Sequence, residues 1–236
     1  MAPRPTKNFD RKAKRRALPR VLLSTEDELL GRSFARHVKS VFRDRLYIKV
    51  NEKCSGEPLG LVEATAERLA NAERRREDQY QSYSLGVCLI DIEAPRRHDR
   101  LPDALSLARD KGIVMITANP CFEIVPLMLW GRPVTSPLST RDAETRLAAA
   151  DTGYDPSQAG GKDLDFDDRR PDLRELAKRA AASRPEEGGF DLVELNPGTN
   201  VDLLIQYCED PRKTFLRGRS NRKCIPGELG YRRRGR

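Results

Sequence analysis

The sequence predicts an α/β protein in which a four-stranded parallel sheet carries helices on both faces. Four short apolar runs, each of a length suited to a buried strand, lie between residues 19 and 133. Between them stand segments whose apolar residues recur at three- and four-residue spacing, as in amphipathic helices. Strands that alternate with helices in this way pair in parallel, and each helix crosses one face of the sheet.

The four expected strands are short, and the third is nearly all apolar until it ends in Asp91 and Glu93. They are RVLLST, RLYIKV, LGVCLIDIE and IVMITA, which begin at residues 20, 45, 85 and 113. The apolar stripe of the first expected helix consists of Leu29, Leu30, Phe34, His37, Val38, Val41 and Phe42. Glu26, Asp27 and Glu28 precede that helix, where the helix dipole favours negative charge. Gly112 is placed to close the helix before the fourth strand.

Composition divides the chain into four parts. Residues 1–18 form a basic arm that we expect to be disordered, and residues 19–133 form the α/β domain. Residues 134–210 are a helical extension of the same unit, with three expected helices and a loop rich in Gly and Asp. Residues 211–236 form a basic C-terminal tail.

The net charge of +8 conceals an asymmetry. Residues 1–20 and 211–236 together carry 18 Lys and Arg against two acids, whereas the rest of the chain carries 26 basic and 34 acidic residues. Basic arms suit the phosphate backbone of RNA or DNA, or an acidic protein surface, and they equally suit a solubilising role.

The composition also bears on the compartment. Five scattered cysteines without a CxxC pair predict neither a disulfide framework nor a zinc site, which favours a reducing environment. No apolar segment resembles a signal peptide or approaches the roughly 20 residues that span a bilayer. We therefore expect a cytoplasmic protein that does not associate with a membrane.

Three acids fall at the carboxyl edge of the expected sheet, where parallel α/β proteins place their functional groups. Glu26 follows the first strand, and Asp91 and Glu93 end the third. Two residues apart in an extended strand, Asp91 and Glu93 should point to one side. Three such carboxylates suit Mg²⁺ or Mn²⁺, which can orient a phosphate and stabilise charge in phosphodiester cleavage. Alternatively, these acids only end a strand or cap a helix.

Asn119 and Glu123 lie at the carboxyl end of the fourth strand and form a possible additional site. They are equally well explained by a helix start. In that interpretation Asn119 caps the next helix, Pro120 begins it, and Glu123 completes a capping-type hydrogen bond.

Four further residues have a structural and a chemical interpretation. Cys121 is expected to pack as a small apolar residue rather than to act as a nucleophile, and His37 is expected in the core. His98 and Lys162 lie in loops from which they could reach a phosphate. For Lys162 a solvated position explains the sequence equally well, and for His98 the phosphate contact is the less favoured interpretation.

Longer motifs make the chain similar to the RloB family. LLSTEDELLGRSF resembles the family's first strand and Glu-Gly-Glu-like motif, and CLIDIEAP resembles its Asp-x-Asp-like pair. ITANPCFEIVPLMLW resembles its strand, SNPCFE element and apolar helix. GYDPSQAGGK and NPGTNVDLLIQY resemble a Tyr-Lys-like loop and an NPST.V..L element, so the similarity covers most of residues 20–208. The chain departs at Asp27, where the family motif has glycine, and in the residues that follow.

The resemblance implies a Toprim-like fold, a role in prokaryotic defence against phage, and a partner ATPase. It also implies a divalent-metal-dependent nuclease acting on RNA or DNA. Glu26 would be the general acid or base, Asp91 and Glu93 would bind Mg²⁺ or Mn²⁺, and Glu26 is a third candidate ligand. The alternative is a non-catalytic sensor or regulatory subunit that docks on the ATPase. The altered loop after Glu26 favours this alternative, and the retention of all three acids favours the nuclease.

Overall fold

The computed structural model describes residues 18–51, 56–74, 82–135, 137–150, 153–158, 160–166, 171–184 and 193–211. Apart from Leu18 and Pro211, the expected basic arm and basic tail lie outside these residues.

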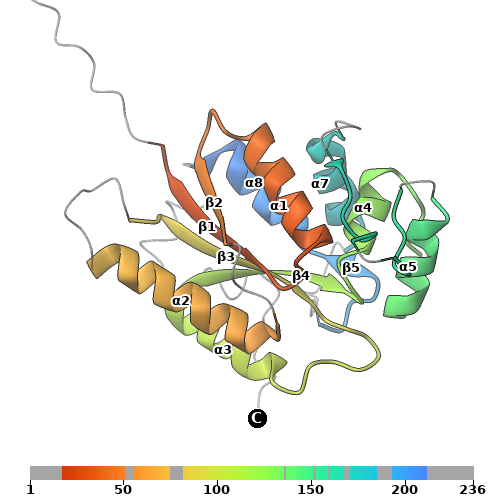
Figure 1. The fold of residues 1–236 in the computed structure, drawn as a ribbon, viewed down its shortest axis with the longest axis horizontal. Helices are drawn as coiled ribbons and strands as arrows, with labels where there is room; N and C mark the ends of the chain where they lie inside the picture. The colour runs from red at the N-terminus through yellow and green to blue at the C-terminus, as the bar shows by residue number, and fades with distance from the viewer. Residues whose placement is uncertain are drawn as a thin grey trace, which may run out of the picture.

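A five-stranded sheet with the order β2-β1-β3-β4-β5 forms the centre of the molecule (Figure 1). Its strands are β1 (Arg20–Thr25), β2 (Tyr47–Asn51), β3 (Leu85–Asp91), β4 (Ile113–Asn119) and β5 (Gly198–Thr199). The first four pair in parallel, as the sequence predicts. The sequence does not predict the two-residue β5, which pairs antiparallel with β4.

Helices cover both faces of this sheet, so the predicted α/β layering is confirmed (Figure 1). The helices are α1 (Leu30–Val41), α2 (Pro58–Arg74), α3 (Leu101–Lys111), α4 (Ile124–Leu129), α5 (Thr140–Ala148), α7 (Leu173–Ala182) and α8 (Val201–Glu209). Helices α2 and α3 cover one face, and the others lie on the opposite side. Gly112 closes α3 in the left-handed conformation, with φ of 67°, as expected.

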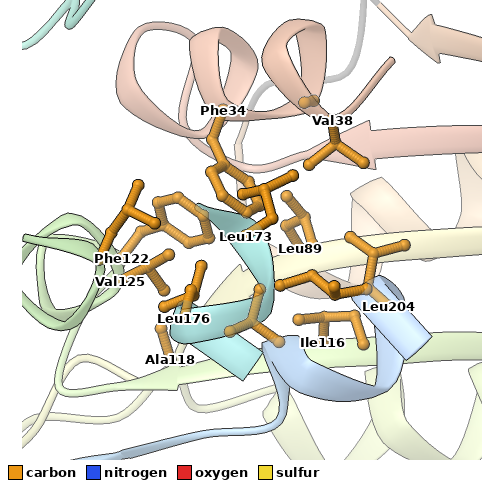
Figure 2. Close-up of a cluster of buried hydrophobic side chains, with 14 of the residues drawn as sticks. Phe34, Val38, Leu89, Ile116, Ala118, Phe122, Val125, Leu173, Leu176 and Leu204 are labelled. Carbon is orange, nitrogen blue, oxygen red and sulfur yellow. The ribbon is translucent and has the colours of Figure 1, made fainter. Parts of the chain in front are cut away.

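Each face of the sheet has its own apolar core. In the larger core, Phe34 and Val38 of α1 lie over Leu89 of β3, and residues of α7 and α8 pack beside them (Figure 2). The smaller core places Ile90 and Met115 against α2 and α3. Strands β3 and β4 are thus covered on both faces. For this reason their sequences are apolar at nearly every position instead of alternating.

Helix α1 is held at its start by Asp27. The two carboxylate oxygens of Asp27 accept hydrogen bonds from the amides of Leu29 and Gly31, at 2.8 and 3.0 Å. These bonds satisfy donors that have no partner within a helix. Val41, which we expected on the buried stripe, is 49% exposed because it is the last residue of α1 and lies at the edge of the packed layer.

The residues after 134 belong to the same core as the sheet, to which α7 and α8 contribute buried leucines. Asn200 explains why a strand forms where only a turn was expected. Its side-chain oxygen accepts from the amide of Thr117 at 2.7 Å, and its side-chain nitrogen donates to the carbonyl of Met115 at 3.0 Å. The amide side chain therefore pairs with β4 as a strand backbone would. None of the helices in the described part of the chain is long and apolar enough to cross a membrane.

Candidate functional site at the carboxyl edge of the sheet

Two of the three predicted acids meet at the carboxyl edge of β1 and β3. The amide of Glu26 donates to the carbonyl of Leu89 at 3.1 Å, which continues the β1–β3 ladder beyond the strand. Asp91 is the last residue of β3, and its amide donates to Oε2 of Glu26 at 3.2 Å. Because the two strands are parallel neighbours, residues 65 positions apart in the chain are joined at this edge.

Glu93 is oriented differently from the prediction. Strand β3 ends at Asp91, and Glu93 has a φ of 56°, which lies in the left-handed region. Its amide donates to the carbonyl of Pro120 at 2.6 Å. The side-chain alternation of an extended strand therefore does not apply to Glu93, so that part of the sequence reasoning is wrong. The Glu93 side chain is 50% exposed.

His98 lies between the carboxylates of Glu26 and Glu93. Its Nε2 is 3.0 Å from Oε1 of Glu26 and 3.5 Å from Oε2 of Glu93. This nitrogen is buried, and no acceptor in the described residues meets it with hydrogen-bond geometry. The two oxygens of Glu26 thus have separate surroundings, a backbone amide at Oε2 and an imidazole at Oε1.

The two acids that meet at the edge both hold protons more tightly than usual. Burial raises the pKa of Glu26 to about 8, although the amide of Asp91 lowers it, and the carboxylate of Glu93 adds to the rise. Burial also raises the pKa of Asp91 well above its usual range, and the carboxylates of Glu123 and Glu26 raise it further. Crowded carboxylates of this kind are stabilised by a bound cation or by a proton.

A second polar cluster centres on Glu123, which is 4% exposed. The Tyr154 hydroxyl donates to Oε1 of Glu123 at 2.6 Å, and Nζ of Lys162 lies 3.7 Å from the same oxygen. Lys162 also donates to Oε1 of Glu144 at 2.5 Å. Because Glu123 raises the pKa of Asp91, the two clusters form one electrostatic unit.

A tight loop carries Lys162 to this position. The amide of Asp155 donates to the carbonyl of Gly161 at 2.8 Å, and a Cβ on Gly161 would lie 2.0 Å from the carbonyl oxygen of Asp155. Only glycine fits there. Burial would lower the pKa of Lys162, but its hydrogen bond to Glu144 and the charge of Glu123 raise it above the ordinary value. Lys162 is thus a charged residue held by acids.

The helix-start interpretation of Asn119 and Glu123 is wrong. Helix α4 begins at Ile124, and the side chain of Glu123 makes no capping hydrogen bond. Asn119 instead donates from Nδ2 to the carbonyl of Val193 at 2.9 Å, and Pro120 lies four residues before the first residue of the helix. Glu123 is turned toward Tyr154, as described above.

Two other expectations concern buried residues. Cys121 is 1% exposed, and burial raises the pKa of its thiol far above the ordinary value, which fits the expected packing role. His37 is 4% exposed and stacks on Phe166 with ring centroids 5.9 Å apart, so it belongs to the core, as expected.

The donor types at this edge fit a hard divalent cation, since Mg²⁺ and Mn²⁺ prefer carboxylate oxygens. The arrangement of these side chains does not yet form a complete metal site. Within the part of the chain that the structure describes, no three His, Cys, Asp or Glu side chains converge as a set of metal ligands. The Glu26 carboxylate meets the backbone amide of Asp91, and the carboxylates of Glu26 and Glu93 lie 3.0 and 3.5 Å from Nε2 of His98. A three-carboxylate site therefore requires the exposed Glu93 side chain to leave His98.

Comparison with known proteins connects this edge to a family. A family model described as RloB-like protein matches residues 24–207, which is most of the chain. The chain belongs to the RloB-like family. The matched residues include Glu26, Asp91 and Glu93, as well as Glu123 and Lys162. No curated protein and no solved structure matches the RloB-like chain.

Sequence reasoning did not find three members of the site. Tyr154 had a signal, because the Tyr-Lys-like loop contains both Tyr154 and Lys162, but nothing paired that loop with Glu123. Glu144 lies on a helix whose charged residues look solvated. The position of His98 between two carboxylates depends on the path of a loop, which has no periodicity to read.

Proposed function

We propose that this RloB-like protein is a divalent-metal-dependent nuclease that cleaves RNA or DNA at the carboxyl edge of its sheet. The observation that supports this best is the contact between Glu26 and Asp91, two acids at strand ends whose pKa values are both raised. Strongly perturbed acids at this edge of a parallel α/β sheet are typical of a functional site. The resemblance to Toprim-type enzymes supports the same assignment.

Each acid has a role in this proposal. Asp91 and Glu93 would hold Mg²⁺ or Mn²⁺, and Glu26 would be the general acid beside them. When bound, the ion would stabilise the charge that develops on the phosphate. Near neutral pH, Glu26 holds a proton, because its pKa is about 8. The amide of Asp91 donates to Oε2, so Oε1, which faces His98, is the oxygen that would give a proton to the leaving oxygen of the phosphodiester.

His98 and Lys162 assist this chemistry from either side. His98 lies 3.0 Å from Oε1 of Glu26 and so stands beside the oxygen that would give up its proton. Lys162 offsets the charge of Glu123, which otherwise opposes ionisation of Asp91. Both residues therefore act through the protonation of Glu26 and Asp91.

A cleavage assay with matched variants tests the proposal. The full chain is incubated with labelled RNA and DNA and Mg²⁺, with and without a partner ATPase and ATP. Glu26→Gln keeps the size of the side chain and removes its proton exchange, and Asp91→Asn removes a ligand charge. General acid–base catalysis is worth about 10²–10⁴-fold, so we expect Glu26→Gln to lose at least that much cleavage while remaining folded. Cleavage by both variants at the parent rate would contradict the proposal.

The arrangement around Glu93 favours a second candidate function. Because His98 separates Glu26 from Glu93, the edge could serve as a polar surface of a sensor or regulatory subunit that docks on an ATPase. That function predicts that Glu26→Gln and Asp91→Asn protect cells from phage as well as the parent does. The nuclease function predicts that both variants lose protection.

The family resemblance also supports a place in the cell. We propose that the protein acts in the cytoplasm in prokaryotic defence against phage, together with an ATPase. Copurification of the full chain with the products of neighbouring genes tests the partner, and a plaque assay with the Asp91→Asn variant tests the defence role. A strain whose protection survives without the ATPase gene would contradict the partnership.

A further inference from the structure

The outer side of α1 carries a stripe of basic residues. Arg32, Arg36 and Lys39 are spaced at four and three residues, so at 3.6 residues per turn they lie within one sector of the helix. Arg43 is exposed in the turn that follows the helix. The buried residues Phe34 and Val38 lie on the other side of the helix. We call Arg32, Arg36, Lys39 and Arg43 the α1 basic stripe.

This stripe differs from the other helical surfaces. Helix α1 contains three Arg and Lys residues and no acid. The other described helices that carry charge either mix basic and acidic residues, as do α2, α3, α5 and α7, or are acidic, as is α8. Outside its basic tails the chain has more acids than bases. Among the described helices that carry charge, α1 thus differs from the others in having basic residues and no acid.

The stripe begins beside the candidate site. Helix α1 starts four residues after Glu26, and Asp27 caps it, so Arg32 lies in its first turn. The Arg32 side chain is 19% exposed and lies 4.0 Å from Glu28, one turn earlier, whereas Arg36 and Lys39 are exposed. From Arg32 to Lys39 the stripe extends about 10 Å along the helix axis, at about 1.5 Å per residue.

A hollow of about 280 Å³ flanks the stripe. Ser33 and Arg36 of α1 line it together with Asp163 and Asp165, and the Ser33 hydroxyl donates a hydrogen bond to Asp163. Asp163 directly follows Lys162, so the hollow lies next to the loop that reaches Glu123. The two aspartates make the hollow itself unfavourable for phosphate, so the surface considered for binding is the exposed side of α1.

We propose that the α1 basic stripe binds the phosphate backbone of a nucleic acid and leads it to the edge formed by Glu26 and Asp91. This inference rests on the proposed function and deepens it, because it assigns a substrate-binding surface within the folded part of the chain. Acidic sites repel a polyanion, and a basic surface beside them raises the local concentration of substrate. Contacts to phosphate depend on charge and position rather than on base sequence.

Binding of labelled single-stranded RNA and duplex DNA to the full chain tests the inference. Fluorescence anisotropy in EDTA, where metal-dependent cleavage is absent, is measured at several salt concentrations. The test variant is Arg36→Gln with Lys39→Gln. The matched control is Arg109→Gln with Lys111→Gln on α3, which removes the same charge from the opposite face of the sheet (Figure 1). Both variants keep the basic tails.

The test variant is expected to bind single-stranded RNA roughly tenfold more weakly at about 0.1 M salt. Its slope of log affinity against log salt should fall by about 0.7 for each lost contact. The control should stay close to the parent. Because Arg36 lines the hollow, a second variant, Lys39→Glu with Arg43→Glu, reverses two charges outside it and should weaken binding further. Parent-like affinity and slope in both stripe variants, or an equal loss in the control, would overturn the inference.

The Glu26→Gln variant separates this inference from the proposed function. It tests cleavage alone, whereas the stripe variants test binding in EDTA, where no metal-dependent cleavage occurs. If the parent cleaves nothing but the stripe variants lose binding, the nuclease proposal fails and the binding surface stands. If cleavage depends on Glu26 but the stripe variants bind normally, the nuclease proposal stands and the binding surface fails.

Discussion

Replacing Glu26 by Gln should change how the stability of the protein depends on pH. The folded state raises the pKa of Glu26 to about 8, whereas an unfolded chain would titrate near its model value of 4.5. The folded state therefore prefers the protonated form. The stability that this preference contributes is fully present below about pH 4.5 and is lost as the pH rises through 8. Gln cannot ionise, so Glu26→Gln should not lose it.

The size of the effect follows from that pKa difference. Each pKa unit is worth about 1.4 kcal/mol, which sets an upper limit of roughly 5 kcal/mol. Water entry and relaxation around a group at the edge of the sheet reduce this figure, so we expect about 2–3 kcal/mol. Near pH 5 the variant and the parent should have similar free energies of unfolding. At pH 9 the variant should be the more stable of the two.

Urea unfolding followed by circular dichroism at pH 5, 7 and 9 measures this difference. Glu63→Gln, a change at an exposed position of α2, is the control and should show little pH-dependent difference from the parent. A Glu26→Gln difference that stays constant from pH 5 to 9 would refute the assignment of a raised pKa to Glu26. An equal pH dependence in Glu63→Gln would refute it as well.

Three more predictions concern metal binding, a buried hydrogen bond and the basic tails. Mg²⁺ or Mn²⁺ should raise the melting temperature, more at pH 8 than at pH 6 because the proposed ligand Asp91 must lose its proton, and Glu93→Ala should remove most of that rise. An unchanged rise in Glu93→Ala would exclude Glu93 as a ligand. Tyr154→Phe removes the hydroxyl that donates to buried Glu123 and should cost about 1–3 kcal/mol in urea unfolding, while a cost near zero would mean that this hydrogen bond does not stabilise the fold. Deletion of residues 1–18 and 211–236 should weaken nucleic-acid binding and flatten its salt dependence, and equal affinity and slope would leave the tails a solubilising role.

The sheet and most helices could be predicted because apolar periodicity records burial directly. Strands β3 and β4 are covered on both faces and are apolar at nearly every position. The side of α1 that packs on the sheet is apolar as well. Strand β5 could not be predicted, since two residues have no period. It forms because Asn200 pairs with the edge of β4, a contact between distant parts of the chain.

The site was predictable to the extent that it follows from strand order. Glu26 and Asp91 meet because they end neighbouring parallel strands, which the alternation of strand and helix implies. The orientation of Glu93 was not predictable, because a hydrogen bond to Pro120 fixes its left-handed backbone. The link between Glu123 and Lys162 depends on how a later loop packs, and the sequence contains only its glycines and its lysine as a signal.

The central claim, that the edge formed by Glu26 and Asp91 binds a divalent cation, is tested most directly by diffraction from crystals of the full chain grown with Mn²⁺. The account predicts an anomalous peak at coordinating distance from a carboxylate oxygen of Asp91, about 2–2.5 Å, and beside Glu26. It also predicts that Glu93 has left His98 and that the peak is lost in Asp91→Asn crystals. Fully occupied Mn²⁺ elsewhere with none at this edge, or a peak that persists in Asp91→Asn, would contradict the account.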